Sequence, residues 1–411
     1  MNFEYFIAKR IIGSKLYKSS VSAPIIKIGI AAIAIGIIVM MIAVATGIGL
    51  QKKIREKTVA FNGHVTISHF DSNASKESIS PVSTEQDFYP EFNTINGINH
   101  IQAVATKFGV IRTETDFEGI VFKGVGSDYN WSYLQDFLIE GALPNYGDTY
   151  RNDILISKFT ANRLGFKVGE SFQLYFAEKD LVKAPRILKC NIVGIFNSGF
   201  QELDETYMIG DLKHLQRINK WETNQVGNFE VFIADFDNLQ TKAIEIYQAI
   251  PSNLNTLTIK EQYQSVFEWI SIFDKNIYAI IGIMIIVAGI NMITALLVLI
   301  LERMQMVGIL KALGSDNWTI RKVFLYNATY LIGVGLFWGN VIGFLLLLIQ
   351  KYFNLFPLDP DVYHVTSVPV YIDLPFIILL NIGTFILCLI MLLVPSYIIT
   401  KITPVKTIKF Q

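Results

Sequence analysis

The sequence predicts an α-helical membrane protein with four transmembrane helices and an α+β domain, outside the cytoplasm, inserted between the first and second helices. Of its 411 residues, 52% are hydrophobic and only 17% are charged, a composition more apolar than that of an average globular protein. Four stretches are also long enough to cross a hydrocarbon core of about 30 Å, which takes roughly 20 apolar residues in a helix. They are residues 26–50, 277–301, 325–349 and 374–399.

Charge distribution predicts the topology, although the formal net charge is zero. Residues 1–50 and 301–411 together hold 13 Lys/Arg against 6 Asp/Glu, whereas residues 51–300 hold 22 against 29. Short flanks rich in Lys and Arg stay in the cytoplasm. We therefore expect the termini (1–25 and 400–411) and residues 302–324 inside, and the domain 51–275 and the loop 350–373 outside.

The first span is preceded by a basic segment, residues 1–25, that reads either as an amphipathic cytoplasmic helix on the membrane surface or as a basic leader. At helical spacing, the apolar residues Phe3, Phe6 and Ile11 lie on one face of this segment and the basic residue Arg10 lies on another. The letters "AVA" at 43–45 resemble a signal-peptidase site. Because the apolar run is too long for a signal peptide and its basic flank spans 27 residues, an uncleaved anchor is favoured.

The external domain alternates predicted strands with short helices, as one large domain or two small lobes. Residues 71–87, which are polar and contain Ser and Pro, predict a mobile loop or a lobe boundary. From residue 259 a helix is predicted to run without a break into the second span. The strands are 64–70, 117–125, 170–176, 186–196 and 228–236, and the helices are 158–165, 211–219 and 238–250.

The third span carries Gly335, Gly339 and Gly343 at strict four-residue spacing. Three glycines on one helix face let another helix approach closely, as in the small-xxx-small packing of membrane helices. The partner helix is either within the same chain or in a second subunit.

Motifs for chemistry are missing from the sequence. It contains no GxxxxGK[ST], HExxH or GxSxG, and no Asp, Glu, Lys or Arg falls in the middle of a span. The five histidines do not form a ligand cluster, and Cys190 and Cys388 fall in different environments, which makes a disulfide improbable. We expect a chain without catalytic residues, metal, cofactor or nucleic-acid partner.

Residues 303–314, between the second and third spans, predict a short amphipathic helix. Met306, Ile309, Leu310 and Leu313 follow the i, i+3, i+4, i+7 spacing of one face. Gly314 is suited to end that helix in the left-handed conformation, and Ser315 or Asp316 to cap the next one. From physical chemistry alone, this helix either docks on a partner or lies on lipid headgroups.

This segment, "ERMQMVGILKALGSDNWTIRKVFL", resembles the signature that follows the second span in FtsX/MacB-type (type VII) ABC transporter permeases. There it forms a coupling helix that docks on a separate ATPase. The start "FEYFIAKR", the external "GIVFKGV", "LGFKVGESFQL" and "GIFNSGFQELDETYMIGDLKHLQ", and the end "VPSYIITKITPVKTIKF" are similar to the lipoprotein-releasing LolC/LolE permeases. One departure is Met306, which stands where the family usually has an acidic residue.

The resemblance implies a non-enzymatic permease that acts as a dimer with a second copy or a paralogue. Its partners would be a cytoplasmic LolD-like ATPase dimer, which holds ATP and Mg²⁺, a lipoprotein cargo, a periplasmic LolA-like carrier and membrane lipids. Alternatives are a MacB-like mechanotransmission or efflux permease and an FtsX-like regulator of a cell-wall hydrolase. The implied ATPase contact and turn comprise Arg303, Met306, Val307, Gly308, Leu310, Lys311, Ala312, Leu313 and Gly314, and candidate acyl-chain contacts are Met40, Met41 and Ile285.

Overall fold

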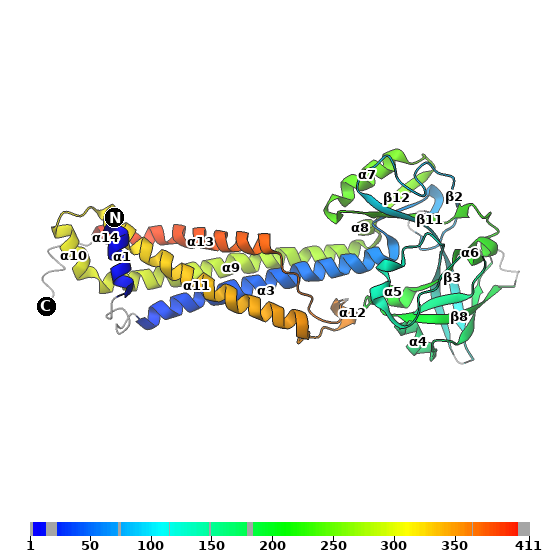
Figure 1. Cartoon of the computed structure of the whole chain (residues 1–411), viewed down its shortest axis with the longest axis horizontal. Helices are drawn as coiled ribbons and strands as arrows, with labels where there is room; N and C mark the ends of the chain where they lie inside the picture. Colours follow the sequence, from blue (N-terminus) through cyan, green and yellow to red (C-terminus); the bar gives the residue numbers. More distant parts are fainter. Residues whose placement is uncertain are drawn as a thin grey trace. The chain divides into compact units, whose positions relative to one another are not determined.

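The computed structural model describes residues 3–13, 23–72, 75–114, 116–147, 149–178, 184–363 and 365–401 (Figure 1). The chain divides into two compact units. Unit 1 comprises residues 1–50, 270–357 and 367–411, and unit 2 comprises residues 51–269 and 358–366. Most of the predicted cytoplasmic tail, from residue 402 onward, lies outside the described residues.

Four helices are long and apolar enough to cross a membrane. They begin and end as follows: α3, Ala23–Asn62; α9, Gln264–Glu302; α11, Asn317–Phe353; and α13, Leu374–Ser396. The first three extend beyond the apolar stretches recognised in the sequence, α3 mainly after its stretch, α9 mainly before and α11 on both sides, because no glycine or proline interrupts those extensions. Gly63, with φ of 68°, ends α3.

In unit 1 the four long helices run side by side and share two apolar clusters (Figure 1). One cluster contains Met292, Phe324, Leu331, Cys388 and Leu392, among others. The other contains Ile37, Met40, Ile277, Leu347 and Leu380. Since lipid is as apolar as these side chains, close packing rather than exclusion of water holds such helices together.

Polar contacts also join α11 to α13. The side-chain amides of Asn340 and Asn381 donate to each other's oxygens at 2.7 and 3.0 Å. Within hydrocarbon a side-chain hydrogen bond of this kind favours one register of two helices over others.

The N-terminal helix α1, Phe3–Gly13, packs against α11. Ala8 and Ile11 are buried against Val323, and Lys322 forms an ion pair with Glu4 at 3.4 Å. The sequence left open an amphipathic helix on the membrane surface or a basic leader; the described part of this segment is a helix, and the protein itself covers one of its faces. Residues 14–22 lie outside the described part of the chain.

Unit 2 is an α/β domain built on one mixed sheet, in the order β12-β1-β11-β3-β4-β9-β6-β8-β5, with β7 paired to β3 and β8. The pairs β4–β9 and β6–β8 are parallel and the others are antiparallel. The strands are β1 Val65–His69, β3 Ile98–Arg112, β4 Phe117–Val125, β5 Leu138–Gly141, β6 Asp153–Ser157, β7 Ser171–Phe176, β8 Arg186–Phe196, β9 Tyr207–Asp211, β11 Asn228–Ile233 and β12 Leu254–Thr258.

The 15-residue strand β3 organises this sheet. Its first half pairs with β11 and its second half with β4, and Val110 and Ile111 also pair with β7. As a result the pairings β3–β4–β9–β6–β8–β7–β3 close into a ring of six strands. Buried Phe122, Phe176 and Met208 come from strands of this ring.

Short helices connect the strands and start at capped residues. Ser157, Asp211 and Thr258 each accept a backbone hydrogen bond at an N-terminus, and Thr258 with Glu261 forms a capping box. The helices are α4 Lys158–Leu164, α5 Gln201–Thr206, α6 Leu212–Asn219, α7 Leu239–Ala249 and α8 Ile259–Gln262, with 3₁₀ turns η1 Phe70–Ser72, η2 Trp131–Tyr133, η3 Gln135–Phe137 and η4 Phe236–Asn238. The connection between α11 and α13 holds α12, Pro360–Tyr363.

The described residues of 71–87, predicted as a mobile loop or a lobe boundary, are mostly irregular and make a few fixed contacts: β2, Val82–Ser83, pairs with β10, Gln225–Val226, and Ser78 donates its backbone N–H to the Thr106 carbonyl. One prediction was wrong: no unbroken helix starts at residue 259. Tyr263 leaves the helical conformation between α8 and α9, with φ of −116° and ψ of 45°, and its side chain is buried.

Candidate functional site

Helix α10, Met304–Ala312, follows α9 directly, with Arg303 at the break. Its end is a Schellman motif: Ser315 donates its N–H to Leu310 and Gly314 donates to Lys311, at 2.9 and 3.0 Å. Gly314 has φ of 89°, a conformation that glycine adopts without strain. The chain thus reverses within a few residues at a position where only glycine fits easily.

Asp316 caps the next helix, α11. Its carboxylate accepts the backbone N–H groups of Trp318 and Thr319 at 3.1 and 3.2 Å. Hydrogen bonds from Thr319 are the main reason that the pKa of Asp316 is lowered. The turn between α10 and α11 therefore has defined geometry at both ends.

The apolar face predicted for 303–314 divides between two environments. Met306 and Leu310 pack against the apolar cluster of unit 1, together with fully buried Val307. Ile309 and Leu313, by contrast, are 52% and 78% exposed. Half of the predicted apolar face is thus partly covered by the chain's own helices, and the other half is exposed.

The exposed apolar residues of this region, which we call the α10–α11 surface, are Met304, Ile309, Ala312, Leu313 and Trp318. A short helix in water would not leave such side chains uncovered without a binding partner or a lipid surface.

Two basic residues near the turn, Lys311 and Arg321, donate hydrogen bonds to the C-terminal ends of the last two helices. Lys311 donates to the carbonyl oxygens of Ile399 and Thr400, at 2.7 and 3.4 Å, in α14, Ile398–Lys401. Arg321 donates to the Ser396 hydroxyl at 3.1 Å and to Leu393 at 3.2 Å. Cations are favoured at helix C-termini, whose carbonyl groups lack partners. The expected contact of Lys311 with a partner's acidic rim stays a prediction.

The three spaced glycines of α11 lie against α3. A Cβ atom on Gly335 would come within 2.8 Å of Ile33, and one on Gly339 within 2.9 Å of the Ala34 carbonyl oxygen. At Gly343 it would come within 3.1 Å of the Met41 sulfur. Of the two possibilities that the sequence left open, these distances favour packing within one chain.

The candidate acyl-chain contacts are also core residues of unit 1. Met40 and Met41 are 0% and 1% exposed, and Ile285 is partly buried against the same cluster. In this conformation neither methionine is accessible to a lipid chain, whereas a contact of Ile285 with an acyl chain stays a prediction. Hydrophobicity alone did not separate the side of the span that packs on neighbouring helices from the side that meets lipid.

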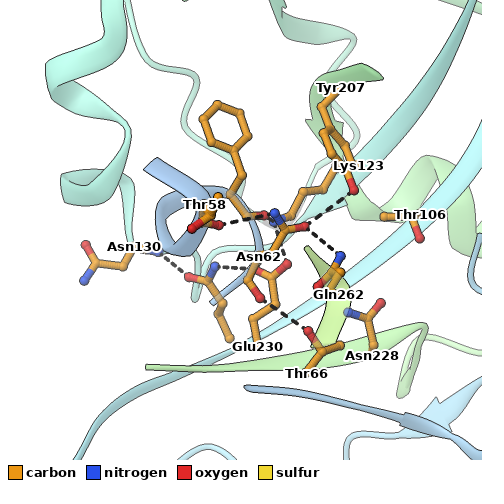
Figure 2. Close-up of polar contacts among 12 residues, drawn as sticks. Thr58, Asn62, Thr66, Thr106, Lys123, Asn130, Tyr207, Asn228, Glu230 and Gln262 are labelled. Atoms are coloured by element: carbon orange, nitrogen blue, oxygen red, sulfur yellow. Dashed lines mark hydrogen bonds and ion pairs between the residues drawn. The ribbon is translucent and has the colours of Figure 1, made fainter. Parts of the chain in front are cut away.

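A buried polar cluster in unit 2 was not recognised in the sequence (Figure 2). Lys123 on β4 and Glu230 on β11 form an ion pair at 2.6 Å, with 1% and 4% of their side chains exposed. Gln102 donates to the second Glu230 oxygen at 2.9 Å, and Lys123 also donates to the carbonyl of Phe61. Burial lowers the pKa of Lys123, and Glu230 opposes that shift.

Beside this pair lies a polar cavity of about 60 Å³, large enough for several water molecules. Its walls include Ser78, Thr106 and Asn228. A Lys within the apolar run "IVFKGV" and a Glu within "NFEVFI" were the available signals. Among the described residues, no group of three or more His, Cys, Asp or Glu is placed to hold a metal ion.

Two protein-family models match the sequence of this chain. The family model for the MacB-like periplasmic core domain matches residues 28–246, and that for the FtsX-like permease C-terminal region matches residues 278–404. The chain belongs to the FtsX/MacB family of ABC transporter permeases. The first match includes most of unit 2, and the second includes α10 and the turn after it.

Individual relatives of this permease carry related names. It is 21% identical to the lipoprotein-releasing system transmembrane protein LolC of Xylella fastidiosa, with 92% of each chain covered. It is 20% identical to LolC of Neisseria meningitidis, covering 93% of this chain and 94% of that protein. It is 19% identical to LolE of Haemophilus influenzae, with 99% of each covered.

Two solved structures also match part of the permease. The extracellular domain of the noncanonical ABC-type transporter YknZ covers 48% of this chain and 100% of its own, at 13% identity and a TM-score of 0.32. A domain of a putative permease from Porphyromonas gingivalis covers 47% and 87%, at 16% identity and a TM-score of 0.26.

Proposed function

We propose that this permease extracts lipoproteins from the outer leaflet of the bacterial inner membrane and passes them to a periplasmic carrier. ATP hydrolysis in a separate cytoplasmic ATPase, which binds ATP and Mg²⁺, drives the transfer. The observation that carries the proposal is the similarity to lipoprotein-releasing LolC and LolE proteins over almost the entire length of both chains. In this proposal unit 2 is periplasmic and is inserted between the first and second spans, and both termini are cytoplasmic.

The α10–α11 surface is the proposed contact with the ATPase. Its exposed aliphatic side chains and Trp318 suit an apolar groove on a partner, since interfaces place such groups at their buried centre. Arg303, at the start of α10, is partly exposed and suits an acidic group at the rim. In this proposal Val307 and Gly308 support the surface by packing inside unit 1, and Lys311 supports it by its hydrogen bond to α14.

Leu313→Asp tests this contact. Leu313 is 78% exposed, so the substitution leaves the packing of unit 1 intact while it places a charge in the interface. We expect the ATPase to be lost when the tagged permease is purified. Ile244→Asp is the matched control, because Ile244 is 51% exposed on α7 in unit 2. Equal ATPase recovery with Leu313→Asp and wild type would contradict the contact. Leu310→Asp is less informative, since Leu310 packs in the core.

Reconstitution tests the transport step. The permease and its ATPase are reconstituted in proteoliposomes together with a triacylated lipoprotein. A soluble carrier is then added on the side of the bilayer that corresponds to the periplasm. We expect transfer of lipoprotein to the carrier on addition of ATP and not of a non-hydrolysable analogue. Transfer at the same rate without ATP would refute the proposal.

A MacB-like mechanotransmission role is the second candidate, favoured by the match of residues 28–246 to the MacB-like periplasmic core domain. It predicts ATPase activity that responds to a periplasmic partner, with no lipoprotein leaving the membrane in the same proteoliposomes.

A further inference from the structure

The last turn of α3, within unit 2, has its terminal groups bound by side chains from other elements. The carbonyl of Phe61 accepts from the buried Lys123 ammonium. Lys123 is in turn held by Glu230 on β11, which also accepts from Gln102 on β3. Because the carbonyls at a helix C-terminus lack partners within the helix and favour a cation, this contact fixes the end of α3 to the sheet.

Asn62, the final residue of α3, extends the same network to Tyr207 and to Gln262 at the end of α8 (Figure 2), and to Tyr263 between α8 and α9. Its side-chain amide donates to the Tyr263 hydroxyl at 3.0 Å. Its side-chain oxygen accepts from Gln262 at 3.3 Å and from Tyr207 at 3.5 Å. Asn62 is 6% exposed and Tyr263 3%, so neither residue is free to exchange these partners for bulk water.

These bonds are directional, which distinguishes them from the apolar packing around them. Apolar contacts tolerate small sliding and rotation, whereas hydrogen bonds weaken steeply when their angles change. A buried amide whose donor and acceptor are both used specifies one geometry, because any other leaves a buried polar group without a partner. The end of α3 and the start of α9 are therefore held in one relative position within unit 2.

We propose that Asn62 and Tyr263 are positioning residues that make the end of α3 and the start of α9 move as one element, and that coupling of ATP hydrolysis to transport needs this. The inference rests on the proposed function, because α3 and α9 each contain a candidate membrane span. Without the Asn62 contact, each helix could move by itself in response to the ATPase, and part of the hydrolysis cycle would be lost without transport.

The test uses Asn62→Ala, Tyr263→Phe and the double variant in the full-length permease bound to its ATPase. Tyr263→Phe keeps the ring that packs against Phe200 and removes only the hydroxyl. Tyr129→Phe is the matched control: Tyr129 is also buried in unit 2, and among the described residues its hydroxyl has no hydrogen-bond partner.

The first measurement is hydrogen–deuterium exchange of backbone amides in residues 58–62 and 263–268. Tyr263→Phe should raise exchange at both segments together, by about fivefold, as expected for loss of a buried hydrogen bond. The double variant should add little to Asn62→Ala, because that change already removes the hydrogen bond to Tyr263. Exchange that rises in only one segment, or additive effects, would overturn the joint movement of the two helix ends.

The second measurement is the number of lipoproteins released per ATP hydrolysed. Tyr263→Phe should lower this ratio at least about twofold while the ATPase rate stays near wild type, and Tyr129→Phe should change neither. A destabilised permease would instead lose release and ATPase activity in proportion, which would overturn the positioning role. If wild type releases no lipoprotein, the proposed function fails, whereas the exchange result still decides whether the two helix ends are joined.

Discussion

The buried ion pair of Lys123 and Glu230 gives the sharpest prediction about stability. Lys123→Met keeps the approximate length of the side chain and removes its charge, which leaves Glu230 uncompensated in a site where only 4% of its side chain is exposed. Breaking a buried pair from one side costs about 3–5 kcal/mol. For a unit of roughly this size a change of 1 kcal/mol moves the melting temperature by about 2–4 °C, so we expect a decrease of roughly 6–20 °C.

The double variant Lys123→Met/Glu230→Gln separates the charge from the other contacts. It removes the unpaired carboxylate and retains an acceptor for Gln102, so the remaining loss is mainly the donor to the Phe61 carbonyl. That loss costs about 1–3 kcal/mol, which makes the double variant more stable than Lys123→Met by about 2 kcal/mol.

The assay is thermal unfolding of the full chain in detergent, followed by tryptophan fluorescence at a fixed scan rate. Three of the five tryptophans, Trp131, Trp221 and Trp269, lie in unit 2 and report on its unfolding. A double variant no more stable than Lys123→Met, or a Lys123→Met midpoint within about 2 °C of wild type, would refute the reasoning.

Two further predictions concern helix packing and pH. Gly339→Leu should destabilise the permease by about 1–3 kcal/mol, since its Cβ would come within 2.9 Å of the Ala34 carbonyl; Gly333→Leu, where a Cβ meets nothing within 4 Å, is the control, and equal melting temperatures would contradict the packing. Burial lowers the pKa of His64 to about 4, and its Nδ1 accepts from Ile233. The unfolded chain therefore takes up this proton first, so stability should fall between pH 6.5 and 4 by at most about 3 kcal/mol. His64→Gln should flatten that dependence in thermal unfolding measured across this range, and an unchanged slope would exclude His64 as its source.

Local patterns in the sequence predicted much of unit 2. The expected strands 117–125 and 186–196 coincide with β4 and β8, because β-branched and aromatic residues alternate there between clear turn signals. The longest strand, β3, was not predicted. Gln102 and Lys107 interrupt its apolar pattern, and both are buried through contacts with distant residues, Glu230 and Glu77. Pairing of that kind is set by the tertiary fold and leaves no local trace.

The candidate site was also predicted only in its local features. Sequence periodicity correctly predicted a helix at 304–312, a left-handed Gly314 and a cap at Asp316. It did not show which apolar residues the other helices of unit 1 would cover, so Leu310 and Leu313 were expected on one face. In the same way, the spacing of the α11 glycines indicated a helix partner but did not identify α3.

The glycine face of α11 also constrains which movements of α3 are possible. Rotation of α3 about its own axis would push a neighbouring side chain into the helix backbone, because no free space remains at Gly335 or Gly339. Displacement along the helix meets a different barrier. The glycines repeat every four residues, and the α3 side chains that face them, Ile33, Ile37 and Met41, repeat at the same interval. A slide of one repeat, about 6 Å, would again bring an apolar side chain opposite a glycine, whereas a smaller slide would press these side chains against the bulkier residues between the glycines.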